Sequence, residues 1–236
     1  MVIQKCTVCG EETLRQFEIK GRSFSFPRAC ACRRKELEAE EEQKKKMELL
    51  NRALDIKALG YLDEAYARYT FDKCDNPDSP ITRQLLQYCE HFDKARDNNR
   101  GMYLFGAARR GKTFYASCIA NYVRQQGIYV LIGTSSELIR HFSNFKSSEL
   151  AEEQIRKYPL MVIDDLGTEE ATEKNIGIIN EIINMRYEAC KPLIVTSNFA
   201  LEDLYKGTGV YGDRITKRIK RICKTILIDG KDRSIK

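Results

Sequence analysis

The chain has no hydrophobic run that approaches the ~20 residues needed to span a bilayer. Its N-terminus, MVIQKCTVCGEE, lacks the apolar core of a signal peptide. Histidine is scarce, because His91 and His141 are the only two, and neither has a partner at metal-ligand spacing. These absences predict a cytoplasmic protein with no membrane partner, and no role is assigned to either histidine.

Cysteine, in contrast, is plentiful, with nine residues in 236. In a reducing compartment this number favours metal ligands or buried thiols over disulfides. The length allows one domain or a domain with a small appendage. An apolar fraction of 42% and a charged fraction of 31% are ordinary for a soluble globular protein.

The positive charge is concentrated at the C-terminal end. Residues 211–236 contain nine Lys and Arg against three Asp, which accounts for the whole net charge of +6. A basic segment on a neutral body is a plausible electrostatic surface for nucleic acid or for an acidic partner. The alternative is a basic helix face that is simply solvated.

Composition divides the chain into three parts. Residues 1–32 carry four of the cysteines, and residues 33–60 are rich in strong helix formers of both charges, which predicts an exposed connector helix. From 61 to 236, apolar strand-like runs alternate with helical patterns; the runs are GMYLFG, IYVLIG, PLMVIDD, PLIVTSN and TILIDG. This alternation predicts an α/β domain with a parallel sheet flanked by helices.

A phosphate-binding loop is predicted between the first of these strands and the helix that follows. Residues 106–113, GAARRGKT, match the P-loop pattern of a glycine, four residues and Gly-Lys-Thr. Backbone N–H groups at such a helix start bind phosphate. Lys112 is expected to neutralise the β- and γ-phosphates, and the Thr113 hydroxyl to bind Mg²⁺. The predicted nucleotide contacts are Gly106, Ala107, Ala108, Arg109, Arg110, Gly111, Lys112, Thr113, Phe114 and Asp164.

Polar residues follow two further strands. The run LMVI leads directly into Asp164 and Asp165. We expect Asp164 to hold Mg²⁺ through water and Asp165 to orient or deprotonate the attacking water. Asn198, at the end of PLIVTSN, is expected to orient the water near the γ-phosphate. A surface Asp pair and a turn-forming asparagine are the alternatives.

A zinc site is predicted near the N-terminus. Cys6 and Cys9 form a C-x-x-C pair, and Cys30 and Cys32 form a C-x-C pair about twenty residues later. Four thiolates in two close pairs suit tetrahedral Zn²⁺. A segment of ~30 residues cannot bury enough surface to fold alone, so metal would supply the missing stability. Free thiols or a redox pair are the alternatives.

Residues 61–236 resemble the DnaC/DnaI group of bacterial AAA+ helicase loaders and its relative, the IstB transposition ATPases. The resemblance rests on ARYTFDKCDN, GMYLFGAARRGKTFYA, YPLMVIDDLGTEE, KPLIVTSNFALEDL and YGDRITKRI. It implies an AAA+ fold with a reduced or absent lid. It also implies that Lys112 and Thr113 are Walker A residues, Asp164 and Asp165 Walker B residues and Asn198 sensor 1. Arg214 looks like an arginine finger that acts in trans, and Arg218 is a weaker candidate.

Two residues depart from the family pattern. Arg109 stands where a glycine is common, which is costly if the position needs a positive φ. Asp165 stands where many AAA+ proteins have Glu, and its shorter side chain would lie farther from the water. Glu169 is near in sequence but is not assigned as the base. We therefore expect ATP binding with slow hydrolysis that DNA or a partner stimulates.

The resemblance implies an ATP-dependent loader of a hexameric replicative helicase onto single-stranded DNA, with residues 1–32 as the helicase-binding module. The alternatives are a transposition helper ATPase and a nucleotide-binding adaptor with little hydrolysis. Arg140 and Lys146, with Phe142 and Phe145 for base stacking, are candidate DNA contacts. A helix with a partly buried apolar face is the other interpretation of that segment.

Overall fold

The computed structural model describes residues 5–19, 21–59, 63–145 and 147–230. They form two compact units, Met1–Arg52 and Ala53–Lys236. The helices are α1 (Ala31–Leu59), η1 (Glu64–Arg68), η2 (Phe71–Lys73), α2 (Pro80–Glu90), α3 (Phe92–Asp97), α4 (Lys112–Gln125), α5 (Ser135–Ser143), α6 (Ser148–Lys157), α7 (Glu173–Glu188) and α8 (Val210–Ile222). The strands are β1 (Leu14–Ile19), β2 (Arg22–Pro27), β3 (Gly101–Phe105), β4 (Val130–Thr134), β5 (Leu160–Leu166), β6 (Leu193–Ser197) and β7 (Cys223–Leu227).

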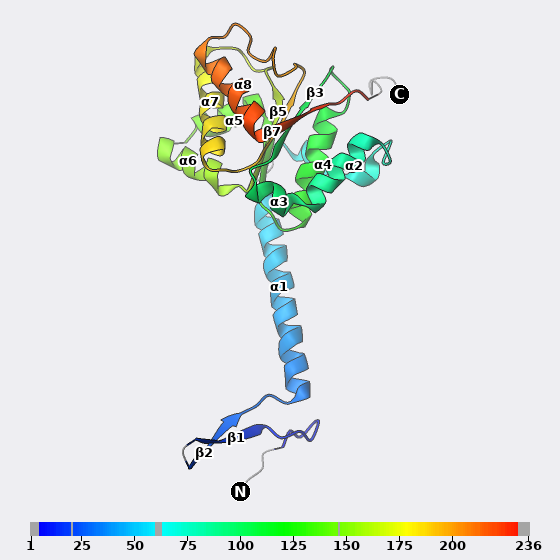
Figure 1. Cartoon of the computed structure of the whole chain (residues 1–236), viewed down its shortest axis with the longest axis vertical. Helices are drawn as coiled ribbons and strands as arrows, with labels where there is room; N and C mark the ends of the chain where they lie inside the picture. Colours follow the sequence, from blue (N-terminus) through cyan, green and yellow to red (C-terminus); the bar gives the residue numbers. More distant parts are fainter. Residues whose placement is uncertain (1–4, 20, 60–62, 146, 231–236) are drawn as a thin grey trace. The chain divides into compact units, whose positions relative to one another are not determined.

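The first unit consists of a cysteine-bearing turn, the antiparallel β1–β2 hairpin and most of α1 (Figure 1). The Glu11 carboxylate accepts a hydrogen bond of 2.5 Å from the backbone N–H of Ala31, the first residue of α1. It thus satisfies one of the N–H groups that a helix start leaves without a partner. Cys30 is the one buried side chain among those described between residues 5 and 45, so the described side chains of this unit form almost no hydrophobic core.

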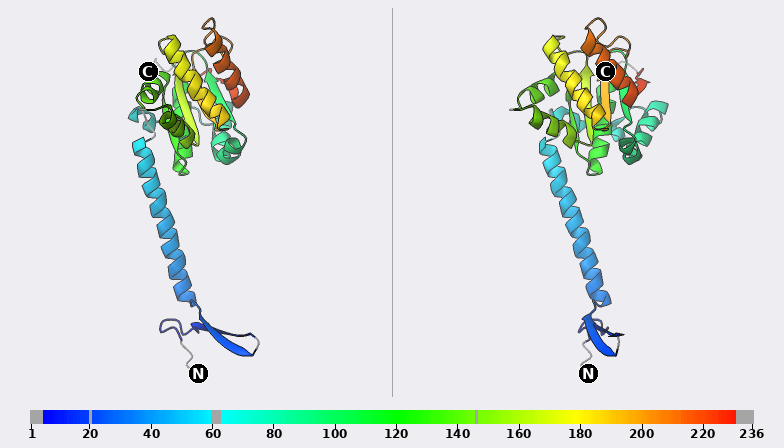
Figure 2. Two further views of the ribbon diagram at one scale, coloured as in Figure 1. Left: turned by 90° about the vertical axis from the view of Figure 1, so that its left-hand side faces the viewer. Right: turned by 60° about the vertical axis from the view of Figure 1, so that its left-hand side comes forward.

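The second unit is a three-layer α/β/α sandwich. Its sheet has the strand order β4-β5-β6-β3-β7, and all neighbouring strands are parallel. Helices α5 to α8 cover one face, whereas η1 and α2 to α4 cover the other (Figures 1 and 2). Because the strands are parallel, their carboxyl ends meet at one edge of the sheet, where ligands bind in open α/β folds.

Burial on both faces explains the continuous apolar runs of the strands. In β5, Met161 and Ile163 belong to the core beneath α5 to α8, whereas Leu160 and Val162 belong to the core beneath α4. Helix starts are set by local caps. For example, α5 begins with a capping box in which Thr134 and Glu137 satisfy each other's backbone N–H groups.

The predicted α/β fold with a parallel sheet between helices is confirmed, and β3 to β7 each overlap one of the five apolar runs. The β1–β2 hairpin was not predicted. Among the described residues β7 is the last element, so the described part of the chain contains no helical lid after it. No described helix is long and apolar enough to cross a membrane.

Candidate nucleotide and zinc sites

The start of α4 presents uncapped N–H groups at the carboxyl edge of the sheet. Its N-cap is Gly111, with φ 97°, and no side chain caps it. Gly106 begins the preceding loop at φ 147°, and a Cβ there would lie 2.5 Å from the carbonyl oxygen of Ile228. A helix N-terminus without a side-chain cap is an anion-binding position. The loop conformation therefore fits a phosphate group.

Lys112 is held over this loop. Its Nζ donates hydrogen bonds of 2.8 Å to the Ala107 carbonyl oxygen and 2.8 Å to the Asn198 Oδ1. Burial lowers the pKa of Lys112, and the charges of Asp165 and Asp164 oppose that shift. The structure thus brings together Lys112 and Asn198, which are 86 residues apart in the sequence.

Asp164 lies at the centre of a hydroxyl cluster. Its Oδ1 accepts hydrogen bonds from the Thr113 Oγ1 at 3.0 Å and from the Thr196 Oγ1 at 2.5 Å. Its Oδ2 accepts a hydrogen bond of 3.3 Å from the Tyr66 hydroxyl. Burial raises the pKa of the Asp164 carboxyl, although these hydroxyls act in the opposite direction. The Thr113 hydroxyl beside a carboxylate is the ligand pair that a P-loop magnesium ion requires, so these residues fit Mg²⁺.

The backbone of Asp165 is held in the left-handed region at φ 52°. Its N–H donates to the Thr196 Oγ1 at 2.8 Å, and its carbonyl oxygen accepts from the Thr168 Oγ1 at 2.7 Å. Non-glycine residues rarely adopt this conformation, which costs about 1–2 kcal/mol. The hydrogen bonds on both sides of Asp165 stabilise this conformation. Asp165 also lines a cavity at the phosphate loop.

Two cavities are lined in part by residues of the phosphate loop. The first, of about 700 Å³, is lined by Ala108, Arg109, Gly111, Lys112, Thr113, Asp165 and Asn198. The second, of about 350 Å³, is lined by Asp75, Asn76, Ser79, Ile81, Arg110, Tyr115, Ile228, Asp229 and Gly230. The first cavity thus brings together Lys112, Thr113, Asp165 and Asn198 from the predicted set. The other predicted residues do not line it: Gly106, Ala107, Arg110, Phe114 and Asp164.

Two loop arginines and one α4 residue of the predicted nucleotide contacts differ in their surroundings. Arg109 has φ 63°, so it carries the backbone cost that the sequence predicts for a non-glycine residue there. Arg110 donates a hydrogen bond of 2.6 Å to the Gly230 carbonyl oxygen and lines the second cavity. The Phe114 ring is buried in the core, and Phe114 does not line the first cavity.

Arg214 and Arg218, two of the three arginines of α8, lie outside the first cavity. Arg214 is exposed and has no lining role there. Arg218 is half-buried, and its Nη1 donates a hydrogen bond of 3.4 Å to the Asn180 Oδ1 on α7. This contact within the same chain makes Arg218 a poorer candidate for a neighbour's phosphate than Arg214.

The candidate DNA segment is corrected in part. The Phe142 ring is buried in the core of the second unit and stacks on Phe145 with centroids 5.8 Å apart, so it cannot stack on a base. Arg140 is exposed. Lys146 lies outside the described residues.

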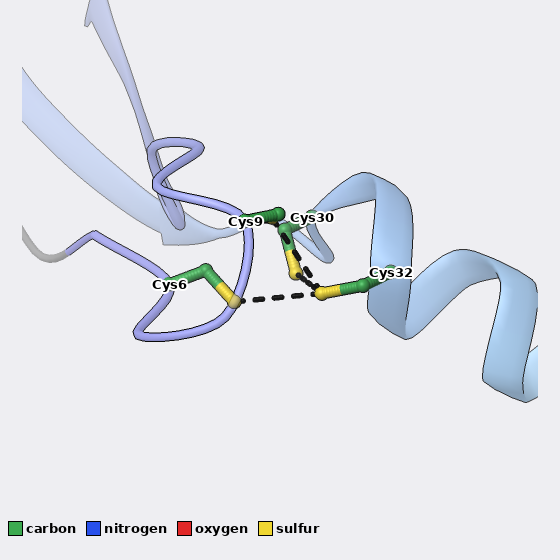
Figure 3. Close-up of side chains that lie close together, drawn as sticks. All are labelled: Cys6, Cys9, Cys30 and Cys32. Carbon is green, nitrogen blue, oxygen red and sulfur yellow. Dashed lines mark hydrogen bonds between the residues drawn. The ribbon is translucent and has the colours of Figure 1, made fainter.

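The four N-terminal cysteines converge on one point (Figure 3). The Cys32 Sγ lies 3.5 Å from the Cys6 Sγ, 3.5 Å from the Cys9 Sγ and 3.1 Å from the Cys30 Sγ, and all four sulfurs lie within 4.8 Å of one another. Four thiolates bound at ~2.3 Å around one ion have sulfurs separated by comparable distances, so the cluster fits Zn²⁺.

The turn that carries the first pair favours thiolate at Cys6. Backbone hydrogen bonds from Cys9 and Val8, followed by those from the Cys30 and Cys32 thiols, lower the pKa of Cys6 to about 6. The neighbouring sulfurs raise the pKa of Cys32. Gly10, at φ 72°, closes the turn by donating its N–H to the Cys6 carbonyl oxygen at 2.9 Å. A cation at the centre would remove the mutual repulsion of the thiolates.

The fold and the phosphate loop define a P-loop nucleotide-binding protein of the AAA+ type. The chain belongs to the family of IstB-like ATP binding proteins, whose profile matches residues 30–234. This membership confirms the family resemblance inferred from the motifs.

Three curated relatives are similar to this chain. The replicative helicase loader DnaI of Bacillus subtilis is 25% identical over 206 residues, which are 80% of this chain and 66% of DnaI. The replicative helicase loader DnaC of Escherichia coli K12 is 29% identical over 57% of this chain and 54% of DnaC. A putative ATP-binding protein in an insertion sequence of Mycobacterium tuberculosis is 27% identical over 57% of this chain and 55% of that protein. The matched regions thus span about half to two thirds of these relatives.

Two solved structures are similar in fold to this chain. A crystal structure of DnaI has a TM-score of 0.60 at 25% identity and matches 72% of this chain and 93% of the solved one. A crystal structure of the DnaC helicase loader has a TM-score of 0.61 at 20% identity and matches 71% of this chain and all of the solved one. These matches confirm the AAA+ fold.

Sequence reasoning missed two residues that shape the magnesium site. Tyr66 precedes Asp164 by 98 residues, and no local pattern connects them. The sequence could have indicated Thr196, because it lies at the same strand end as Asn198, beside the strand that carries Asp164. A small polar residue at the carboxyl end of a neighbouring parallel strand is a reasonable candidate for such a contact.

Proposed function

We propose that the chain is an ATP-dependent loader of a hexameric replicative helicase onto single-stranded DNA. The observation that carries the proposal is the similarity to the replicative helicase loader DnaI over 80% of the chain, together with the P-loop site. ATP binding and hydrolysis would control assembly with the helicase and release from it. Hydrolysis is expected to be slow, because Asp165 has a short side chain.

Bound ATP and Mg²⁺ would supply the scissile γ-phosphate and the charge that polarises it. Lys112 would turn its ammonium from the Asn198 Oδ1 and the Ala107 carbonyl to the phosphate oxygens. Thr113 and Asp164 would hold the metal ion, the latter through water. Asp165 and Asn198 would orient the attacking water.

The second cavity is the proposed site of the base. It is lined by Arg110 of the phosphate loop and by Tyr115 of α4, whereas the adjacent loop residue Arg109 lines the first cavity. Its wall combines apolar side chains with the polar groups of Asn76, Ser79 and Asp229. Pockets that bind bases combine apolar contact with a few polar groups in this way.

Arg214 is proposed to complete the site of a neighbouring subunit. It is exposed on α8, so it is available to a second copy of the chain. An arginine that acts in trans on the transferred phosphoryl group is worth 10³–10⁵ in rate in other NTPases. The chain would therefore self-associate when ATP is bound, and hydrolysis would release the neighbours.

Residues 1–32 are proposed to bind the helicase with Zn²⁺ bound, residues 33–60 to connect, and residues 61–236 to act as the ATPase. One face of the hairpin supports a binding role. Phe17, Phe24 and Phe26 are 42%, 42% and 56% exposed on that face, with Arg15 over the Phe17 ring. Exposed aromatic residues of this kind mark interaction surfaces.

A transposition helper is the second candidate, because one relative is a putative ATP-binding protein in an insertion sequence. The discriminating experiment is a pull-down of replicative helicase and transposase candidates with the full chain, with and without ATP. Loading predicts capture of the helicase and its loss in Cys32→Ser but not in Cys190→Ser. Capture of the transposase alone would contradict the loader function and support a transposition helper. If Lys112→Ala left helicase loading intact, the chain would be a nucleotide-binding adaptor.

A further inference from the structure

Glu169 is a buried carboxylate that the proposed reaction does not use. It lies in the loop between β5 and α7 and is 7% exposed. Its Oε2 accepts hydrogen bonds from the Ser135 Oγ at 2.5 Å and from the Gly167 N–H at 2.9 Å. Its Oε1 accepts one from the Tyr205 hydroxyl. The carboxylate therefore joins three segments: the start of α5, the loop after β5 and the segment between β6 and α8.

The same cluster holds Asp165. The single hydroxyl proton of Ser135 goes to Glu169, and the same Oγ lies 3.3 Å from the Asp165 carbonyl oxygen. Thr168, next to Glu169, donates both its hydroxyl at 2.7 Å and its N–H at 3.2 Å to that carbonyl. The left-handed conformation of Asp165 needs such support, because the backbone strain would otherwise relax. The position of Glu169 thus bears on where the Asp165 carboxylate points.

The cluster also fixes the start of α8. Gly167 packs so closely on the segment after β6 that a Cβ there would lie 2.9 Å from the Leu204 Cδ1. Gly212, in the first turn of α8, is pressed on Tyr205, since a Cβ on Gly212 would lie 2.8 Å from the Tyr205 Cβ. Arg214 follows Gly212 by two residues. Displacement of Tyr205 would therefore shift the turn that carries Arg214.

We infer that Glu169 is a positioning residue that joins the water-orienting Asp165 of one active site to the α8 arginine offered to the neighbouring site. This inference rests on the proposed function and deepens it. Asp165 serves the subunit's own ATP, whereas Arg214 serves the ATP of the neighbour. Because one carboxylate is hydrogen-bonded to the loop after β5 and to Tyr205, a displacement of either segment would strain the hydrogen bonds that hold the other.

The test removes one hydroxyl from the cluster. Tyr205→Phe deletes the donor to the Glu169 Oε1 and preserves the ring. Loss of a hydrogen bond to a charged acceptor is expected to lower kcat about tenfold. The Kd for ATP should stay within twofold, since Tyr205 does not line the phosphate cavity. Tyr187→Phe is the matched control, because that hydroxyl on α7 accepts from Arg221 at 3.1 Å, away from the cluster.

A second readout is independent of hydrolysis. Backbone hydrogen exchange of the full, nucleotide-free chain should accelerate in residues 166–170 and 205–214 together in Tyr205→Phe and in neither segment in Tyr187→Phe. Ser135→Ala acts on the same carboxylate, so the double variant Ser135→Ala/Tyr205→Phe should lose less activity than the product of the single losses. A merely structural role would lower stability without this split between kcat and Kd.

The possible outcomes distinguish failure of the positioning role from failure of the proposed function. Unchanged exchange at 205–214, unchanged kcat or fully multiplicative losses would each overturn the positioning role. Absence of ATP binding by the wild-type chain would overturn the proposed function instead, and the exchange experiment would still decide whether Glu169 joins the two segments.

Discussion

Zinc removal should unfold the N-terminal module and leave the ATPase unit intact. Cys30 is the one buried side chain described between residues 5 and 45, and burial of a side chain of that size contributes only ~1–2 kcal/mol. Structural zinc contributes about 10–16 kcal/mol in small domains. The zinc contribution is as large as the total stability of a typical domain, so the β1–β2 hairpin should have no stable tertiary structure without the ion.

The assay is metal analysis followed by NMR of the full chain. One zinc per chain is expected, and a chelator should collapse the amide resonances of residues 5–30 into the unfolded range. Cys32→Ser should have the same effect because the Cys32 Sγ lies within 3.5 Å of all three other sulfurs. The exposed Cys190 supplies the control Cys190→Ser. Well-dispersed hairpin resonances in the metal-free chain would refute the reasoning.

Three further changes test other parts of the structure. Arg186 is fully buried and donates hydrogen bonds to the carbonyl oxygens of Ile155, Tyr158, Pro159 and Pro192, so Arg186→Met should lower the free energy of unfolding of the second unit, measured in urea, by about 3–5 kcal/mol. The control Arg221→Met removes one exposed contact and should change the free energy of unfolding by less than ~0.5 kcal/mol. Equal losses in the two variants would contradict the prediction. Burial raises the pKa of the Asp164 carboxyl in the folded chain, so the folded state is favoured when this carboxyl is protonated. The contribution of Asp164 to stability is therefore fully present below the unfolded pKa of about 3.9 and is lost as the pH rises through the folded pKa. Asp164→Asn should therefore raise the Tm of the nucleotide-free chain at neutral pH, with no gain at pH 3, and a constant gain at all pH values would argue against the burial effect. Arg214→Ala should abolish ATP-dependent self-association in analytical ultracentrifugation, while the Kd of the monomer for ATP is unchanged. If the variant still self-associates with ATP, Arg214 does not act on the site of a neighbouring subunit.

The sequence determined the local parts of the site. The phosphate loop could be predicted because its residues are contiguous and because the strand before it and the helix after it follow from short apolar patterns. The same holds for Asp164 and Asp165, which follow directly on an apolar strand. The two cysteine pairs were recognisable because metal-binding turns need short spacings within each pair. The resemblance to the family, in which a glycine is common at position 109, indicated a backbone cost if that position needs a positive φ, and Arg109 has φ 63°.

The tertiary structure alone decided which distant groups share a site. Tyr66 reaches Asp164 across 98 residues, and Glu169 meets Ser135 and Tyr205 across 34 and 36 residues. Arg186 donates to the carbonyl oxygen of Ile155 in α6 and to that of Pro192 in the loop before β6. No periodicity in the sequence records such contacts, because they depend on strand order and on how closely segments approach. The spacing of neighbouring residues fixes the loop that faces a phosphate, whereas packing of the whole sheet fixes which hydroxyls and carboxylates surround it.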